Sequence, residues 1–112
     1  MSYAFVKDLN FRPAGKPTLR DFFARKAPQG RQEQLVVILY YLSKELGVTG
    51  IGADHIYTAF KEVEKAVPMN ISKMIHSIST RKGWFSTSAA GYALTVGGEN
   101  FVEHELPKSA ST

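Results

Sequence analysis

The sequence contains no cysteine among its 112 residues. Disulfide bridges, thiolate metal sites and thiol redox chemistry are therefore excluded, and the core has to come from ordinary apolar packing. The longest uninterrupted apolar run, residues 35–42, is eight residues long, whereas a helix that spans a membrane needs about 20. The N-terminus also lacks the basic start and long apolar stretch of a secretory signal. We therefore expect a cytoplasmic protein with no membrane contact.

Sequence patterns for catalysis and cofactors are missing as well. The three histidines form no pair at the i, i+3 or i, i+4 spacing of metal ligands on a helix: His55, His76 and His104. Gly97 and Gly98 lack the further glycines and the lysine of a phosphate-binding loop. No nucleophile elbow surrounds Ser77 or Ser79. We expect no metal, no cofactor and no enzymatic activity.

The charge of the chain is positive and unevenly distributed along it. The net charge is +4 and the sequence pI is about 9.4, which permits an anionic partner. Half of the fourteen basic residues precede residue 32: Lys7, Arg12, Lys16, Arg20, Arg25, Lys26 and Arg31. The acidic residues Glu99, Glu103 and Glu105 gather near the C-terminus.

A short first helix is predicted at residues 19–26. Thr18 and Asp21 resemble a capping box at its start, with aspartate in place of the usual glutamate or glutamine. Pro28 and Gly30 end the segment.

The strongest helix of the sequence covers residues 31–46 and is closed by Gly47. Apolar residues occupy nearly all of its faces, which indicates either burial between neighbouring elements or use at a subunit interface. We expect it to be the central helix, with a homodimer contact through Tyr40 or Tyr41.

The next segments alternate between turns and helices. Residues 48–52 form a connector that adds a brief strand. A helix follows through about Lys65, because apolar residues recur there at i, i+3, i+4 and i+7: Ile56, Ala59, Phe60 and Val63. After a turn at 66–69, Asn70 caps a polar-faced helix that ends at Gly83. The apolar stripe of that helix is Ile71, Met74, Ile75 and Ile78.

A hairpin and a last helix complete the pattern. The runs 84–88 and 92–96 are predicted strands, joined by a three-residue turn at 89–91 whose final glycine is left-handed. Trp84 and Phe85 are expected to pack on Ile75 and Ile78. Thr95 caps a final helix containing Phe101 and Val102. We expect three parts: an N-terminal arm at 1–17 that pairs as an edge strand, wraps the domain or stays mobile, a single domain at 18–106, and a flexible tail at 107–112.

This order of elements resembles the winged helix-turn-helix domain from about Arg31 to Leu106. Residues 94–102 also resemble the leucine, threonine and glycine junction that follows the wing in that superfamily. The resemblance implies a mostly helical α+β fold, with a three-helix core, a β-hairpin wing and extra N-terminal and C-terminal helices. It further implies a small, non-enzymatic DNA-binding protein of the kind that regulates transcription, in some cases as a homodimer.

In that interpretation the helix at 70–82 enters the major groove of double-stranded DNA. Five of its side chains are placed to reach base edges or phosphates: Ser72, Lys73, His76, Ser77 and Thr80. Arg81 and Lys82 would hold the backbone. The predicted wing contains no Lys or Arg, so four earlier cations would have to supply the missing positive charge, provided that they fold onto the same face: Arg20, Arg25, Lys26 and Arg31.

The alternative is a winged-helix module that binds a protein, or a homodimeric adaptor that uses helix 31–46, without DNA binding. The uncharged wing, the acidic C-terminal segment and the apolar central helix favour this alternative. A surface helix with no binding role would also have the polar face seen at 70–82.

Overall fold

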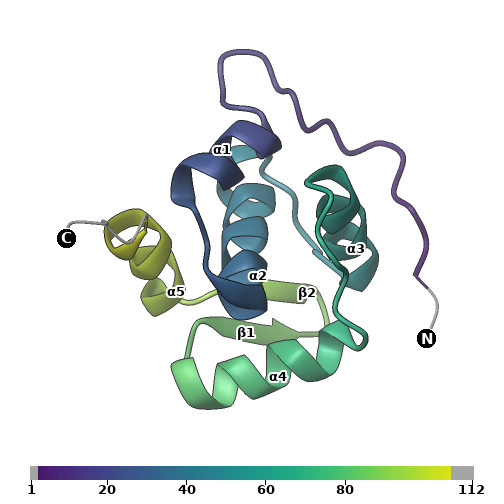
Figure 1. Ribbon diagram of the computed structural model, residues 1–112. Coiled ribbons are helices and arrows are strands. Elements are labelled where there is room, and N and C mark those ends of the chain that lie inside the picture. Colours follow the sequence, from purple (N-terminus) through teal and green to yellow (C-terminus); the bar gives the residue numbers. More distant parts are fainter. Residues whose placement is uncertain (1–2, 107–112) are drawn as a thin grey trace.

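The computed structural model describes residues 3–106 of the chain (Figure 1). The element order is α1 Leu19–Lys26, α2 Gly30–Tyr40 with a π-helical continuation η1 Tyr41–Glu45, α3 Ala53–Glu62, α4 Ile71–Lys82, β1 Phe85–Ser88, β2 Gly91–Leu94, and α5 Val96–Asn100 with a π-helical continuation η2 Phe101–Glu105. The fold is mostly helical α+β, as the sequence predicts. Within the described residues, no helix is long and apolar enough to cross a membrane. The predicted tail at 107–112 lies outside them.

Helix α2 lies in the middle of the molecule. Figure 1 shows α1 crossing its upper part, α3 and α5 on either side, and α4 with the hairpin below. All five residues of Leu35–Leu39 are 0% exposed, because neighbouring elements of the same chain cover every face of the helix. The prediction of a central helix is confirmed.

The two tyrosines predicted to contact a second copy are used within the chain. The Tyr40 hydroxyl donates to Glu103 at 2.8 Å, and burial together with this bond raises the pKa of Tyr40 well above its usual value. Tyr41 is buried and its hydroxyl donates to the carbonyl of Pro17 at 2.6 Å. Desolvation, followed by the charges of nearby glutamates, raises the pKa of Tyr41 to about 12. The expected homodimer contact through helix 31–46 therefore finds no support.

The predicted helix caps are confirmed. Thr18 accepts the backbone N–H of Asp21 at the start of α1. Asn70 accepts that of Lys73 at the start of α4, and Thr95 accepts that of Gly98 at the start of α5. These side-chain oxygens satisfy N–H groups that have no partner within the first turn of a helix.

Several predicted boundaries are wrong. Strand β2 ends at Leu94 rather than at residue 96, because Thr95 caps α5 and Val96 begins it. Helix α3 ends at Glu62 rather than near Lys65, because the chain reverses at Glu64, which takes a positive φ of 58°. The hairpin loop has two residues, 89 and 90, rather than three, and Gly91 belongs to β2 opposite Ser88.

The close approach of residue 51 explains the hairpin register. Tyr92 donates its N–H to the carbonyl of Ile51 at 2.8 Å. The brief strand predicted at 48–52 is therefore reduced to one isolated bridge at Ile51. Gly91 has a φ of 124°, and a Cβ there would lie 2.6 Å from the carbonyl oxygen of Ile51. Glycine is therefore favoured twice at this position: side chains other than glycine rarely adopt this φ, and a Cβ would collide with the connector.

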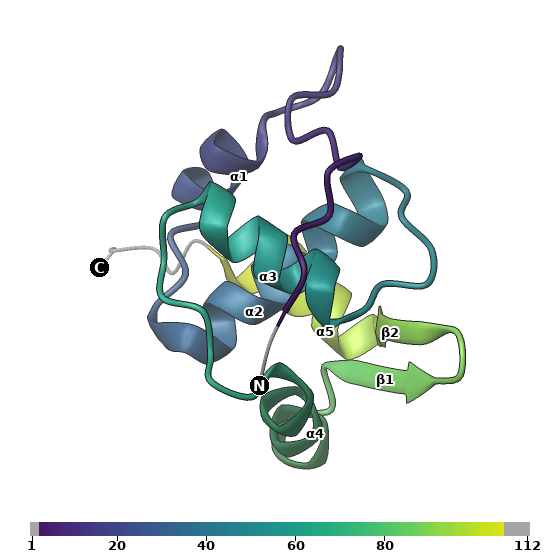
Figure 2. The same ribbon diagram turned by 90° about the vertical axis from the view of Figure 1, so that its right-hand side faces the viewer.

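The N-terminal arm wraps the domain along α3. The N–H of Ala4 donates to Asp54 at 2.9 Å and that of Val6 to Thr58 at 2.8 Å. The rings of Tyr3 and Tyr57 stack with centroids 5.6 Å apart. Figure 2 shows the arm passing in front of α3 and down to the start of α4.

Trp84 and Phe85 are buried, as predicted, although Trp84 precedes β1 rather than starting it. The Trp84 ring stacks on that of Phe101, with centroids 4.2 Å apart. Gly98 makes this approach possible, since it is buried against the backbone of Trp84. A Cβ at Gly98 would overlap the carbonyl oxygen of Trp84 and lie 3.0 Å from the Leu94 side chain.

Replacing Gly98 by alanine is expected to destabilise the protein by about 1 to 3 kcal/mol, because α5 must shift away from the hairpin. The adjacent change Gly97→Ala is the matched control: its Cβ would have only ordinary contacts, the nearest at 3.6 Å. That variant should gain up to about 1 kcal/mol from helix propensity. Urea unfolding, monitored by far-ultraviolet circular dichroism, measures the free energy of unfolding of both variants. Equal stabilities for the two variants would contradict the packing role of Gly98.

Candidate nucleic-acid interface

Helix α4 lies at one end of the molecule with one side against the core (Figure 1). Ile71, Ile75 and Ile78 are 0% exposed. The residues on the opposite side of the helix are exposed: Lys73, His76 and Thr80. Three of the predicted DNA-contacting side chains therefore point away from the protein body.

One flank of α4 adjoins the hairpin. The Ser72 hydroxyl lies 2.6 Å from the hydroxyl of Tyr92 in β2, which joins the helix to the hairpin. The exposed side chains of β1 are hydroxyls, Ser86, Thr87 and Ser88. This flank is polar and uncharged.

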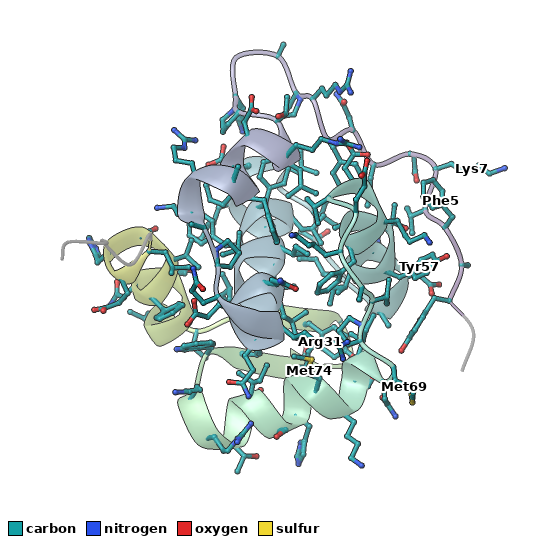
Figure 3. All side chains as sticks on the ribbon, in the orientation of Figure 1. Phe5, Lys7, Arg31, Tyr57, Met69 and Met74 are labelled. Atoms are coloured by element: carbon teal, nitrogen blue, oxygen red, sulfur yellow. The ribbon has the colours of Figure 1, made fainter. Side chains whose placement is uncertain are left out.

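The other flank of α4 faces the first turn of α2 across a pocket of about 230 Å³. Figure 3 shows Arg31 and Met74 next to each other between the two helices. The pocket is lined by three cations, by polar side chains and by apolar side chains: Arg31, Lys73, Arg81, Gln32, Asn70, Ser77, Pro68, Met69, Met74 and Ile78.

Negative charge is absent from this part of the chain. No Asp or Glu occurs between residues 66 and 98, the stretch that forms α4 and the hairpin. None of the ion pairs formed among residues 3–106 involves Arg31, Lys73 or Arg81. Lys82, at the end of α4, has its ammonium 5.8 Å from the centre of the Trp84 ring. The cations of α4 are therefore not neutralised by carboxylates of the described chain.

Four cations that precede α4 in the sequence were expected to add positive charge to its surface. Only one of them lies next to α4. Arg31 does, because it lies in the first turn of α2, next to α4. Arg20 instead pairs with Glu62 and Glu64 of the segment that ends α3, at 3.4 and 3.0 Å.

The remaining two, Arg25 and Lys26, lie beside the Phe22 ring at the C-terminal end of α1. Lys26 also donates to the carbonyl of Leu106. Figure 1 shows α1 crossing the part of α2 that is remote from α4, so these cations belong to an element away from the α4 surface.

Some helical hydroxyls are already engaged. Thr80 donates to the carbonyl of His76 at 3.0 Å and Ser79 to that of Ile75 at 2.8 Å. Their lone pairs remain as acceptors, while their protons are directed back to the helix. Residues 3–106 contain no group of three or more His, Asp or Glu side chains that could hold a metal ion.

Tyr3 contributes to the position of α4, which sequence reasoning missed. Its hydroxyl accepts the N–H of Ile71 at 3.0 Å and donates to the carbonyl of Met69 at 3.3 Å. The arm thus satisfies a first-turn N–H of α4 from 68 positions away, a separation that periodicity and capping patterns do not cover.

No protein-family model matches the sequence, no curated protein is significantly similar to it, and no solved structure is significantly similar to its fold. A function for this surface therefore has to be inferred from its own residues.

The change Tyr3→Phe is expected to cost about 1 to 3 kcal/mol, because it removes two hydrogen bonds that each have a usual net value of about 0.5 to 1.5 kcal/mol. Amide exchange at Ile71 should accelerate, while exchange at Ile78 in the middle of α4 should change less. Tyr57→Phe is the control, since it keeps the stacking partner and leaves the bonds of Tyr3 in place. Unchanged exchange at Ile71 in Tyr3→Phe would show that the arm does not hold the start of α4.

Proposed function

We propose that this protein is a non-enzymatic winged-helix protein that binds double-stranded DNA, with α4 in the major groove. The order of α2, the Ile51 bridge, α3, α4 and the hairpin supports a winged helix-turn-helix, in which the second helix of the pair is the one that reads DNA. The observation that carries the proposal is the surface of α4, where Lys73, Arg81 and Lys82 lie near Arg31 and no carboxylate within residues 3–106 forms an ion pair with them.

The dimensions of the helix and of the groove define which side chains meet which part of the DNA. A helix with its side chains is about 10–12 Å across, close to the width of about 12 Å of the major groove. The outward residues His76 and Thr80 would therefore face base edges, and the two flanks would face the two backbones. Phosphates on one side would meet Arg31, Lys73 and Arg81, and those on the other would meet the hydroxyls of the hairpin flank.

The number of cations sets the expected salt dependence. Each neutralised phosphate contributes about 0.9 to the slope of log K against log salt concentration. Four cations on this face predict a slope of about −3 to −4, which is roughly a hundredfold loss of affinity between about 50 and 200 mM salt. This value separates the proposal from DNA binding through one or two incidental lysines.

A second candidate function, a protein-interaction module, is favoured by a different surface. Phe5 is 58% exposed and Met69 is 88% exposed, and Figure 3 shows them with Tyr57 on the side of the molecule that carries the arm. Large apolar side chains exposed together are typical of protein interfaces. This candidate predicts association with a protein, or with a second copy, that resists salt.

Reversing two charges of α4 with Lys73→Glu and Arg81→Glu should weaken binding to random-sequence duplex DNA by at least about tenfold at 100 mM salt. Fluorescence anisotropy measures the affinity. The matched control is Lys7→Glu with Arg12→Glu, which makes the same change of net charge at two exposed positions of the arm. Circular dichroism must show that both variants remain folded.

Unchanged affinity in the folded Lys73→Glu, Arg81→Glu variant would reject α4 as the docking surface. Equal losses in both variants would mean that net charge alone attracts the DNA. Failure of the unaltered protein to bind duplex DNA even at about 50 mM salt would reject the proposed function and leave the protein-interaction candidate.

A further inference from the structure

The pocket between α2 and α4 combines features of an anion site. Arg31 comes from α2, Lys73 and Arg81 come from α4, and all three line a space of about 230 Å³. We propose that this pocket, called here the Arg31 pocket, binds a single phosphate group. The proposal names a ligand for one flank of α4, and where that phosphate belongs to DNA it rests on the proposed function.

The side chains fit the charge and geometry of phosphate. Two guanidinium groups offer planar pairs of N–H donors that match two phosphate oxygens, and a lysine adds a point charge. The Ser77 side chain supplies a hydroxyl, and Asn70 and Gln32 supply amide groups. Among the described residues no carboxylate lines the pocket, so none of them competes with an anion there.

The floor of the pocket strengthens these interactions. Pro68, Met74 and Ile78 are apolar, and Pro68 and Ile78 are buried. Charges beside apolar groups interact more strongly than charges fully surrounded by water. Three like charges around such a floor repel one another, and an anion bound between them relieves that repulsion.

The size of the pocket favours a small group over a whole cofactor. Sites for drug-sized ligands typically measure about 300–1,000 Å³, which is larger than the 230 Å³ found here. Two sources provide the same chemistry: a backbone phosphate of DNA whose groove holds α4, and a free phosphorylated small molecule. The position of the pocket beside the outward face of α4 favours the backbone phosphate.

The first arm of the test uses Arg31→Gln and duplex DNA. Arg31 is exposed at the start of α2, so its replacement is compatible with folding, and glutamine keeps a polar side chain while removing the charge and the guanidinium donors. Anisotropy titrations at several salt concentrations should show a slope smaller by about one, with a similar loss of affinity for different DNA sequences. Arg12→Gln is the matched control, an exposed arginine of the arm, and should keep the slope of the unaltered protein.

The second arm uses adenosine monophosphate and inorganic phosphate, followed by the amide chemical shifts of Lys73, Ser77 and Arg81. Binding at the pocket should shift these signals in the unaltered protein and in Arg12→Gln, and the shifts should disappear in Arg31→Gln. Adenosine without phosphate should leave them unchanged.

The two arms separate failure of the inference from failure of the proposed function. DNA binding with an unchanged slope in Arg31→Gln overturns the Arg31 pocket and leaves the proposed function standing. The protein could also fail to bind DNA and still show chemical-shift changes with adenosine monophosphate that are lost in Arg31→Gln. That result would support the pocket and reject the proposed function. Absence of binding in both arms overturns both.

Discussion

The burial of α2 is the interaction on which the rest of the molecule depends. Helices α1 and α3, strand β2 and the segment η2 pack against this helix, and its residues from Leu35 to Leu39 are 0% exposed. Since the first turn of the same helix carries Arg31, the packing that builds the core also fixes where that cation lies relative to α4. The candidate interface is therefore assembled by the core itself, and loosening α2 would separate Arg31 from Lys73 and Arg81.

Much of the fold was predictable because its signals are local. The caps at Thr18, Asn70 and Thr95 act within three residues of their positions, and the apolar period places the buried stripe of α4 directly. The register of the hairpin was not predictable in this way. It depends on Ile51, which meets Gly91 and Tyr92 from 40 positions earlier in the chain, and the sequence around Ala89–Gly91 is equally compatible with a three-residue turn.

The residues of the candidate site likewise fall into those placed by local sequence signals and those placed by tertiary packing. Helix periodicity is enough to place Lys73, His76 and Thr80 on the outer side of α4. It does not predict that Arg31 lies beside α4 while Arg20 does not. That difference arises from the crossing of α1 over α2 and from the ion pairs that Arg20 forms with Glu62 and Glu64. The contribution of the arm through Tyr3 is likewise tertiary.

The environment of Trp84 gives the molecule a built-in optical reporter. It is the one tryptophan of the sequence, is 8% exposed, and has the Phe101 ring and the Lys82 ammonium within 4.2 and 5.8 Å of its ring. The fluorescence of an indole responds to nearby charge and to water. A displacement of Lys82 toward a ligand would therefore change the wavelength or the intensity of the Trp84 emission. Events at the end of α4 can thus be followed in the unlabelled protein.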